Sequence, residues 1–177
     1  MNKLFAEDYY RMTGKRWSLR SGLHLLYRHD LRYLKHLRSG KSGLIFRIVS
    51  IYYGQKYGLE ILTANIGRGL YLGHAQNINV HPDVVIGNNC NLSKGCTIGR
   101  ENRGQRNGAP VLGDRVWVGT NAVVVGNIRV GSDVLIAPNA YVNMDVPDHS
   151  IVVGNPGVIK VCSGLATEHY IANIIED

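Results

Sequence analysis

The chain has 177 residues, of which 45% are hydrophobic and 19% charged, and it carries a net charge of +7 at neutral pH. This composition excludes an intrinsically disordered chain, and the length suits one core domain with a modest appendage. No apolar run approaches the ~20 residues of a membrane span, the start lacks the apolar stretch of a signal peptide, and three cysteines without a CxxC pair do not suggest a disulfide framework. We therefore expect a cytoplasmic globular protein.

The first 58 residues are predicted to form a basic helical region. Residues 1–60 hold 12 Lys and Arg against 4 Asp and Glu, whereas residues 61–177 hold 8 against 9. A solvated helical face explains such an excess, and attraction to an anionic substrate or membrane surface is the alternative. No nucleic-acid motif accompanies the charge, so we expect no nucleic-acid partner and leave peripheral membrane contact through this region open.

Apolar spacing predicts two helices in this region. The apolar residues recur at three- and four-residue steps, at Leu19, Leu23, Leu26, Tyr27, Leu34 and Leu37. This spacing predicts one helix that ends before Gly40. A second apolar stretch, Leu44 to Tyr53, predicts another helix that Gly54 and Gly58 end. We expect both helices to serve packing and assembly.

From about residue 61 the sequence repeats every six residues. Twelve aliphatic residues follow one another at six-residue steps with two exceptions: Ile66, Leu72, Val80, Ile86, Leu92, Ile98, Leu112, Val118, Val124, Val130, Ile136 and Val142. Six residues make a short strand and a tight corner, and three such units close one coil of a triangular prism. Stacked coils then bury three aliphatic columns, and the ends need caps, for which we expect the helices and the segment after Val146. Cys90 and Cys96 fall on interior positions and are predicted to be core residues.

The hexads IGNNCN, LSKGCT, LGDRVW, VGTNAV and VGSDVL, with the closing VVGNPG, resemble the hexapeptide-repeat acyltransferases. Within that family, YLGHAQNINVHPDVVIG followed by a loop and APVLGDRVWVG is similar to the serine acetyltransferase branch. That branch includes many acetyltransferases of surface-polysaccharide synthesis. The resemblance implies a mainly β fold, a left-handed parallel β-helix over residues 59–160, between the helical region 1–58 and a tail at 161–177. It also implies acetyl-CoA as the co-substrate, and a homotrimer or a multiple of three with sites between neighbouring prisms.

The first break in the repeat lies between Leu72 and Val80, where the step is eight residues and Gln76 takes the interior slot. His74 lies in this break, and local violations of a strict pattern often mark functional sites. The resemblance places His74 on the family's catalytic histidine, and an imidazole suits removal of a proton from an acceptor hydroxyl. The alternative is a surface or capping histidine without a catalytic role.

Further site residues follow from the resemblance. It implies that the pantetheine of the co-substrate runs along a corner edge past Gly99, Thr120 and Pro138, with Lys160 as the nearest candidate for a phosphate contact. Glu60, the one acid a short way upstream, is the candidate that orients His74. The alternatives are a solvated tail lysine for Lys160 and an ordinary exposed glutamate for Glu60.

The second break is a fourteen-residue step from Ile98 to Leu112, which predicts a protruding polar loop. Serine acetyltransferases end this loop with a histidine that helps to hold the amino-acid acceptor, whereas this chain has Ala109. Three loop residues, Arg100, Arg103 and Asn107, are instead predicted to grip a small-molecule or lipid-linked sugar, unless the loop is simply solvated. The other histidines are expected on surfaces, and since they lack the spacing of a metal cage we expect no metal.

The sequence therefore predicts an enzyme, an acetyl-CoA-dependent O-acetyltransferase. Its preferred acceptor is a sugar hydroxyl in surface-polysaccharide synthesis, with His74 as general base. The alternative is serine O-acetylation in cysteine synthesis, and the remote alternative is a non-catalytic β-helix scaffold.

Overall fold

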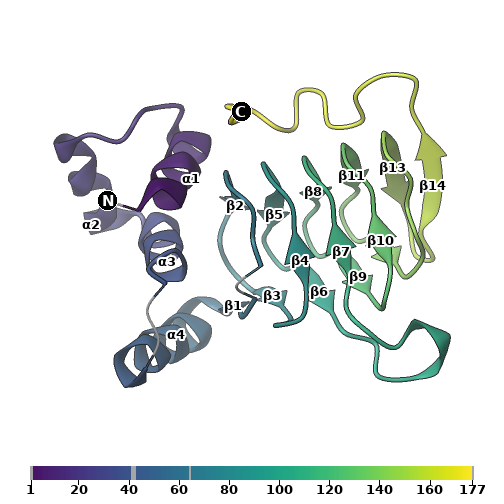
Figure 1. Ribbon diagram of the computed structural model, residues 1–177, viewed down its shortest axis with the longest axis horizontal. Coiled ribbons are helices and arrows are strands. Elements are labelled where there is room, and N and C mark those ends of the chain that lie inside the picture. The colour runs from purple at the N-terminus through teal and green to yellow at the C-terminus, as the bar shows by residue number, and fades with distance from the viewer. Residues whose placement is uncertain (1, 41–42, 64, 177) are drawn as a thin grey trace.

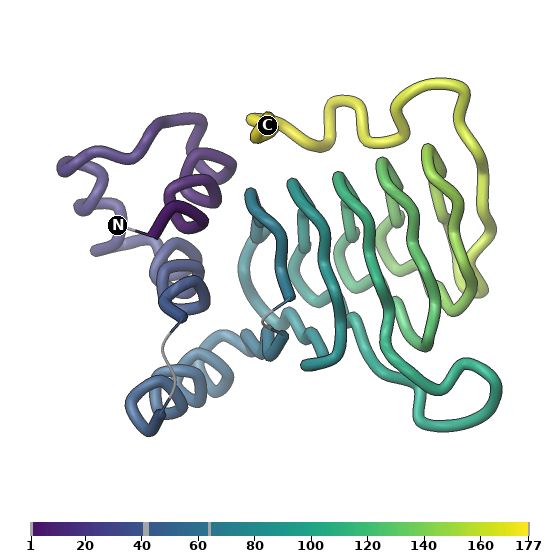
Figure 2. Tube along the Cα trace, in the orientation of Figure 1, coloured from purple at the N-terminus to yellow at the C-terminus, as the bar shows by residue number. Residues whose placement is uncertain are grey.

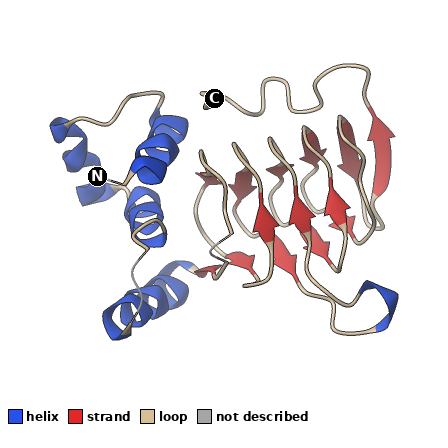
Figure 3. Cartoon of the chain, viewed as in Figure 1, coloured by secondary structure: helices blue, strands red, loops and turns tan. Residues whose placement is uncertain are grey.

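The computed structural model describes residues 2–40, 43–63 and 65–176. The chain forms a small helical region followed by a three-sided parallel β-helix, and the helices stand at the end of the prism where its first coil begins (Figure 1). Helices and strands are almost completely segregated, with one short helical turn in a loop as the exception (Figure 3). The predicted mainly β fold with an N-terminal helical region is confirmed.

Three sheets make the sides of the prism, and each strand is only two to four residues long. Sheet A contains β1 (Leu59–Ile61), β3 (Ile78–Val80), β6 (Thr97–Gly99), β9 (Val123–Val125) and β12 (Tyr141–Val142). Sheet B contains β4 (Val85–Ile86), β7 (Val111–Leu112) and β10 (Arg129–Val130). Sheet C contains β2 (Tyr71–Gly73), β5 (Asn91–Ser93), β8 (Trp117–Val118), β11 (Val134–Ile136), β13 (Ser150–Val153) and β14 (Val158–Val161).

The six-residue repeat sets the register of all three sheets. Pairing aligns Ile66, Ile86, Leu112, Val130 and Val146 in one column, Leu72, Leu92, Val118, Ile136 and Val152 in the second, and Ile61, Val80, Ile98, Val124 and Val142 in the third. All of these side chains are buried. Because burying an aliphatic side chain stabilises a fold by about 1.5–3 kcal/mol, the columns are the main source of the prism's stability. The predicted columns are confirmed.

Cys90 and Cys96 occupy interior positions between the columns and are completely buried. Burial raises the pKa of each thiol to about 12. A thiol that stays protonated near neutral pH is a poor nucleophile, so both cysteines act as small core residues, as predicted.

The helical region differs from the prediction. It contains α1 (Lys3–Thr13), η1 (Leu19–Leu23), α2 (His24–Tyr27), α3 (His29–Leu37) and α4 (Leu44–Tyr57). The single helix predicted through Leu19 to Leu37 is wrong, because Arg28 adopts an extended conformation (φ −95°, ψ 99°) that separates α2 from α3. The predicted second helix is confirmed: it runs through Gly54 to Tyr57, and Gly58, one of the two glycines expected to end it, closes it with a φ of 63°.

Buried polar contacts fasten the helices to the first coil. Arg38, just after α3, donates to both carboxylate oxygens of Asp8 in α1, at 2.8 and 3.1 Å, and also to the carbonyls of Ile66 and Gly67. Asp8 in turn accepts from the Leu70 amide at 2.8 Å. Removing either member of such a buried pair leaves a charge without its partner, so these contacts fix the position of the helical cap.

The C-terminal tail runs back along the outside of the prism until it reaches α1 (Figure 2). The segment after Val146 ends the prism as expected, since β14 pairs antiparallel with β13 at the edge of sheet C, but the tail beyond it does not cover the last coil, because polar groups on the prism hold it elsewhere. Asn89 exchanges side-chain hydrogen bonds with the backbone of Ile175, and Arg11 in α1 donates to the Ala172 carbonyl. The tail therefore ties the far end of the chain to the helical region.

Asp133 is the central attachment point of the tail. Its buried carboxylate accepts from the amides of Ala166 (2.9 Å) and Thr167 (3.2 Å), the Thr167 hydroxyl (2.5 Å) and His149 Nδ1 (2.8 Å). Burial alone would raise the pKa of Asp133, but the hydrogen bonds from Thr167, His149 and the tail amides outweigh it and hold the pKa below its usual value.

We predict that acid releases the tail at Asp133. A carboxyl group whose pKa is lowered by folding stabilises the folded state above its unfolded pKa of about 3.9, and that contribution is lost as the pH falls through the folded value. Protection of the tail amides against hydrogen exchange, measured relative to an unstructured chain at the same pH, should therefore fall below about pH 4. Asp133→Asn should loosen the tail already at neutral pH, at a cost of about 1–3 kcal/mol, because it removes the charged acceptor. Equal tail exchange in Asp133→Asn and wild-type protein at neutral pH would contradict this role.

Candidate functional site

The corner between β2 and β3 carries the first break in the repeat. Four residues, 74–77, separate Gly73 from Ile78 here, whereas two residues separate the matching positions Ser93 and Cys96 in the next coil. The predicted interior position of Gln76 is wrong: its side chain is exposed. Ala75 and Ile78 face the interior instead, with exposed fractions of 1% and 0%. The two extra residues thus form a bulge that leaves the apolar core filled.

His74 lies at the start of this bulge. Its φ is 53°, in the left-handed region that other corner residues of the prism, such as Asn121 and Asn139, also adopt. The side chain is exposed, and its ring makes no hydrogen bond within the described part of the chain. What distinguishes His74 is an exposed, unpaired imidazole in the extra residues of the bulge, where it is accessible to a ligand.

The helical region braces the bulge directly. His29 Nε2 donates to the Ala75 carbonyl at 2.9 Å, and the His29 ring stacks on Tyr57 with 4.3 Å between the ring centroids. The Asn77 amide donates to the Tyr57 carbonyl at 2.8 Å. Helical periodicity predicted only a surface position for His29, because it contains no signal for a contact 46 residues away.

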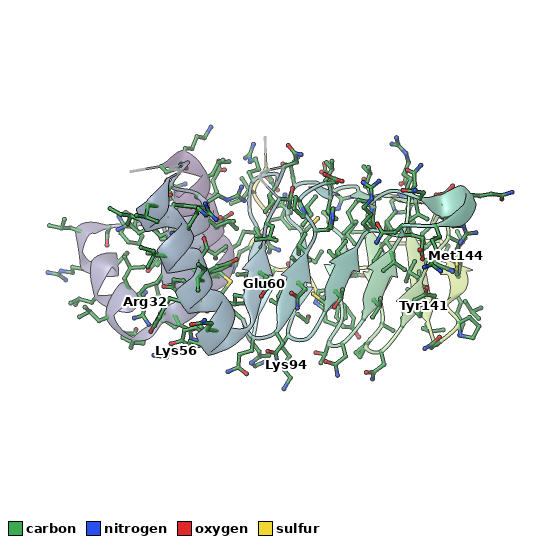
Figure 4. All side chains as sticks on the ribbon, turned by 90° about the horizontal axis from the view of Figure 1, so that it is seen from below. Arg32, Lys56, Glu60, Lys94, Tyr141 and Met144 are labelled. Carbon is green, nitrogen blue, oxygen red and sulfur yellow. The ribbon has the colours of Figure 1, made fainter. Side chains whose placement is uncertain are left out.

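Four corner residues lie one above another along the edge where sheet C turns into sheet A. We call this the His74 edge and define it by His74, Lys94, Thr120 and Pro138. Backbone hydrogen bonds link successive corners, from Lys94 to the Gly73 carbonyl (2.8 Å), from Asn121 to Lys94 (3.1 Å) and from Asn139 to Thr120 (2.9 Å). Lys94 projects outward from this edge in Figure 4. The corners are closely stacked: a Cβ on Gly119 would lie 2.6 Å from the Pro138 nitrogen, so this position requires glycine.

Two of the predicted ligand-binding residues lie on this edge and two do not. Thr120 and Pro138 belong to the His74 edge. Gly99 ends β6 and pairs with Val125, which puts it on the opposite side of sheet A. Lys160 is exposed on β14, where it pairs with Ile151 on the sheet C side. Neither Gly99 nor Lys160 therefore lines the edge itself.

Thr120 is suited to meet an extended ligand on the His74 edge. It is half-buried, and its amide and hydroxyl make no hydrogen bond to any residue that the structure describes. Of the residues that match Thr120 in the neighbouring coils, Lys94 already donates its amide to the Gly73 carbonyl, and Pro138 has no amide hydrogen. Thr120 therefore offers free donors to a ligand such as a pantetheine amide.

Glu60 is not joined to His74. It lies in β1 opposite Asn79, and its side chain is exposed over the face of sheet A, where it lines a cavity of about 600 Å³ with residues of α3 and α4. In Figure 4 Glu60 lies over that face, whereas Lys94 lies at the edge. No hydrogen bond or ion pair links Glu60 and His74 in the described residues, so an orienting role for Glu60 stays a prediction.

The second break forms a protruding loop between β6 and β7, as predicted (Figure 2). Its neck is a short antiparallel bridge between Glu101 and Gly108, and η2 (Gly104–Arg106) lies at its tip. Arg100 pairs with Asp83 at 2.7 Å and donates to Asn107 Oδ1 at 3.0 Å. Two of the three predicted acceptor-binding residues are thus engaged with the chain's own side chains.

The remaining loop residues do not approach His74. Arg103 lines a separate cavity of about 440 Å³ with Gly126 and Asn143. Ala109 is half-buried and packs against the core of the prism. The loop leaves the prism between sheets A and B, whereas His74 lies between sheets C and A, so loop and base occupy different edges of one chain.

The described residues contain no group of three or more His, Cys, Asp or Glu side chains placed to hold a metal ion. None of their helices is long and apolar enough to cross a membrane.

Comparison with known proteins identifies relatives of this fold. The family profile "Bacterial transferase hexapeptide (six repeats)" matches residues 109–143. A serine acetyltransferase of Staphylococcus aureus (strain Mu50) is 33% identical over 148 residues, which cover 82% of this chain and 68% of the relative. Across the curated relatives, the chain spans about two thirds of their length, for instance 66% in one case.

Solved structures of serine acetyltransferases also resemble this chain. The Neisseria gonorrhoeae serine acetyltransferase in complex with serine matches with a TM-score of 0.65 and 28% identity, over 90% of this chain and 67% of that one. A serine acetyltransferase in complex with CoA matches with a TM-score of 0.59 and 25% identity, over 79% and 57% of the two chains. These likenesses confirm the left-handed β-helix. The chain belongs to the hexapeptide-repeat acyltransferase family.

Proposed function

We propose that this chain transfers the acetyl group of acetyl-CoA to a hydroxyl group, with His74 as the general base. The observation that carries the proposal is the bulge at residues 74–77, which presents an unpaired imidazole at the start of an edge of stacked corners. A catalytic base needs an accessible lone pair and a fixed position, and the contacts from His29 and Tyr57 supply the second requirement.

The chemistry follows from this arrangement. The imidazole of His74 takes the proton from the acceptor hydroxyl, and the oxygen attacks the thioester carbonyl. The tetrahedral intermediate then collapses, expels the CoA sulfur and leaves the acetyl group on the acceptor oxygen. The imidazolium returns its proton to the leaving thiolate, so the base is restored.

The co-substrate is supported by the comparisons and by Thr120. A related acetyltransferase was solved with CoA, and the free donors of Thr120 lie on the same edge as His74. We propose that pantetheine follows the His74 edge past Thr120 and Pro138. Gly99 on the far side of sheet A is then left for contacts from a neighbouring chain, and Lys160 remains the candidate for a phosphate contact near the last coil.

The acceptor that the comparisons favour is serine rather than a sugar. The named relatives are serine acetyltransferases, and one was solved with serine. This reverses the order given by the sequence, which preferred a sugar of surface-polysaccharide synthesis. Ala109 still favours a sugar as the acceptor, because its methyl group packs against the core and supplies no polar contact to an amino acid. Serine is therefore the first acceptor to test and a sugar hydroxyl the second.

We predict that purified protein releases CoA from acetyl-CoA when serine is added. The measurement is thiol release with a panel of acceptors that includes serine, free hexoses and nucleotide sugars. Ala109→His should improve the Michaelis constant for serine several-fold without improving that for a sugar, since it restores a polar side chain at the end of the loop. Release with a sugar but not with serine would overturn the serine assignment, and no acetyl transfer to any hydroxyl would overturn the proposed function.

We further propose that the active unit is a trimer or a multiple of three. The outward face of α4 exposes Leu44, Ile45, Ile48, Ile51 and Tyr52, with exposed fractions of 48–80%. Leu62, just after β1, is also 59% exposed. An apolar surface of this extent is typical of a subunit interface. Around a threefold axis, the loop of one chain can reach the His74 edge of the next.

A further inference from the structure

A second exposed apolar surface lies at the pole of the molecule, on the side of the helical region that faces away from the strands. We define this N-terminal pole as residues 15–27, which include η1 and α2; it occupies the left end of the view in Figure 1. Four large apolar side chains of the pole face solvent: Leu19 (99% exposed), Leu23 (62%), Leu26 (74%) and Tyr27 (69%).

The exposed apolar residues of the pole belong to a segment that is anchored to α1. Its four exposed apolar residues all lie in the short helical segment formed by η1 and α2, from Leu19 to Tyr27. Two other residues anchor the segment to α1: Trp17 packs edge-on against Tyr9 with 4.9 Å between the ring centroids, and His24 Nδ1 makes a hydrogen bond of 2.8 Å with the Tyr9 hydroxyl. The outward leucines are therefore held in place, and they are not the result of a loosely packed segment.

The charge around these leucines has a single sign. Lys15, Arg16 and Arg20 are all exposed, and residues 15–27 contain no acid. The nearest acids along the chain, Asp8 and Asp30, are buried and paired with Arg38 and Arg28. Nothing on the pole thus neutralises its three exposed cations.

We propose that the N-terminal pole docks on an anionic lipid surface. Leucines and a tyrosine beside lysine and arginine match the interface of a bilayer, where apolar side chains enter the boundary region and cations meet anionic headgroups. A second copy of the pole fits less well, because a symmetric contact brings both sets of cations together. A nucleic acid would use the cations but gives the exposed leucines no partner.

The proposed trimer strengthens this contact. When three prisms associate around an axis parallel to their length, the three poles point in the same direction, so one particle presents three docking segments to one membrane. Weak single contacts then combine through a high effective concentration. The inference goes beyond the proposed reaction and holds for either acceptor, since the pole is built from residues that do not touch the His74 edge.

Vesicle co-sedimentation of the full-length chain tests the proposal. Wild-type protein should sediment with vesicles that contain phosphatidylglycerol, but only weakly with pure phosphatidylcholine, and higher salt should weaken the binding. Two variants test the apolar and the charged residues of the pole separately. The leucine variant combines Leu19→Ser, Leu23→Ser and Leu26→Ser, and the arginine variant combines Arg16→Gln and Arg20→Gln. Each set should weaken binding to anionic vesicles by about tenfold or more.

Two control substitutions test whether the loss of vesicle binding is specific to the pole. Arg129→Gln and Leu165→Ser remove an exposed cation and an exposed leucine far from the pole, so vesicle binding should not change. Acetyl transfer in solution should be unchanged in the pole variants, which also shows that they fold. Failure of wild-type protein to bind anionic vesicles, or equal binding by the pole variants, would overturn the proposal.

Two other outcomes also reject a lipid surface. If the leucine variant halves the particle mass in light scattering and neither protein binds vesicles, the pole is a contact between two copies of the chain. If wild-type protein binds a DNA duplex rather than vesicles, and only the arginine variant loses that binding, the pole is a nucleic-acid site.

Discussion

Replacing His74 with asparagine is expected to lower kcat by about 10²-fold or more, while affinity for acetyl-CoA and thermal stability stay close to wild type. Asparagine is the informative replacement because it tolerates the left-handed backbone that His74 adopts (φ 53°), whereas alanine adds strain at the same position. Asparagine keeps a polar side chain on the bulge but offers no nitrogen lone pair that can take a proton.

Steady-state kinetics with acetyl-CoA and the best acceptor measure this effect, and CoA titration checks the binding. His169→Asn is the matched control, because His169 also has a left-handed backbone (φ 65°), and its side chain is 90% exposed in the tail and should not affect kcat. Glu60→Gln should reduce kcat less than His74→Asn, since an orienting group acts only through the base. If His74→Asn turned over at the wild-type rate, His74 would have no part in the mechanism.

The parts of the fold that could be predicted are those in which sequence position determines spatial position. Each coil stacks on the one before it, so a six-residue period fixes which side chains face inward and which corners align. Ile86, Leu92 and Ile98 illustrate this, because each pairs with the residue that the repeat assigns to it. The same regularity made His74 visible, since a bulge in a strict repeat has no packing reason of its own.

The parts that could not be predicted depend on contacts between distant segments. The break between α2 and α3 at Arg28, the brace from His29 and the Asp8–Arg38 pair all join residues that no local pattern relates. The tail is the extreme case: Asn89 and Asp133 are ordinary corner residues in the sequence, and only the folded chain shows that they hold the tail. The tail was expected to cover the last coil, but its hydrogen bonds to Asp133 and Asn89 hold it along the side of the prism instead.

The orienting acid illustrates a different limit. Glu60 lies only a short way before His74 in the sequence. The chain turns around the prism between them, however, so Glu60 lies on the face of sheet A and His74 at the corner between sheets C and A. Within one chain the His74 edge is open, and no described residue completes it. A neighbouring chain is the physical source of the missing wall, and this leads to the second large prediction.

Two inactive variants are expected to restore activity when they assemble together. One chain carries His74→Asn. The other has residues 102–107 replaced by Asn-Gly, a turn that suits the short antiparallel bridge between Glu101 and Gly108 and so keeps the neck of the loop. Each variant alone should have little activity, because every site in its trimer lacks either the base or the covering loop.

In a mixed ring, each site that combines an intact His74 from one chain with an intact loop from its neighbour is complete. Random assembly of equal amounts gives roughly one quarter of the wild-type number of such sites over all particles, and about one third in the mixed trimers themselves, since each mixed ring has a single complete site. The measurement is acetyl transfer after co-expression with two different affinity tags, with mixed particles isolated on both tags in turn. A site made within one chain predicts no recovery at any mixing ratio, because each chain then carries its own defect. Verified mixed trimers without recovered activity would therefore reject the shared site, and full activity of the shortened-loop chain alone would show that the loop does not complete it.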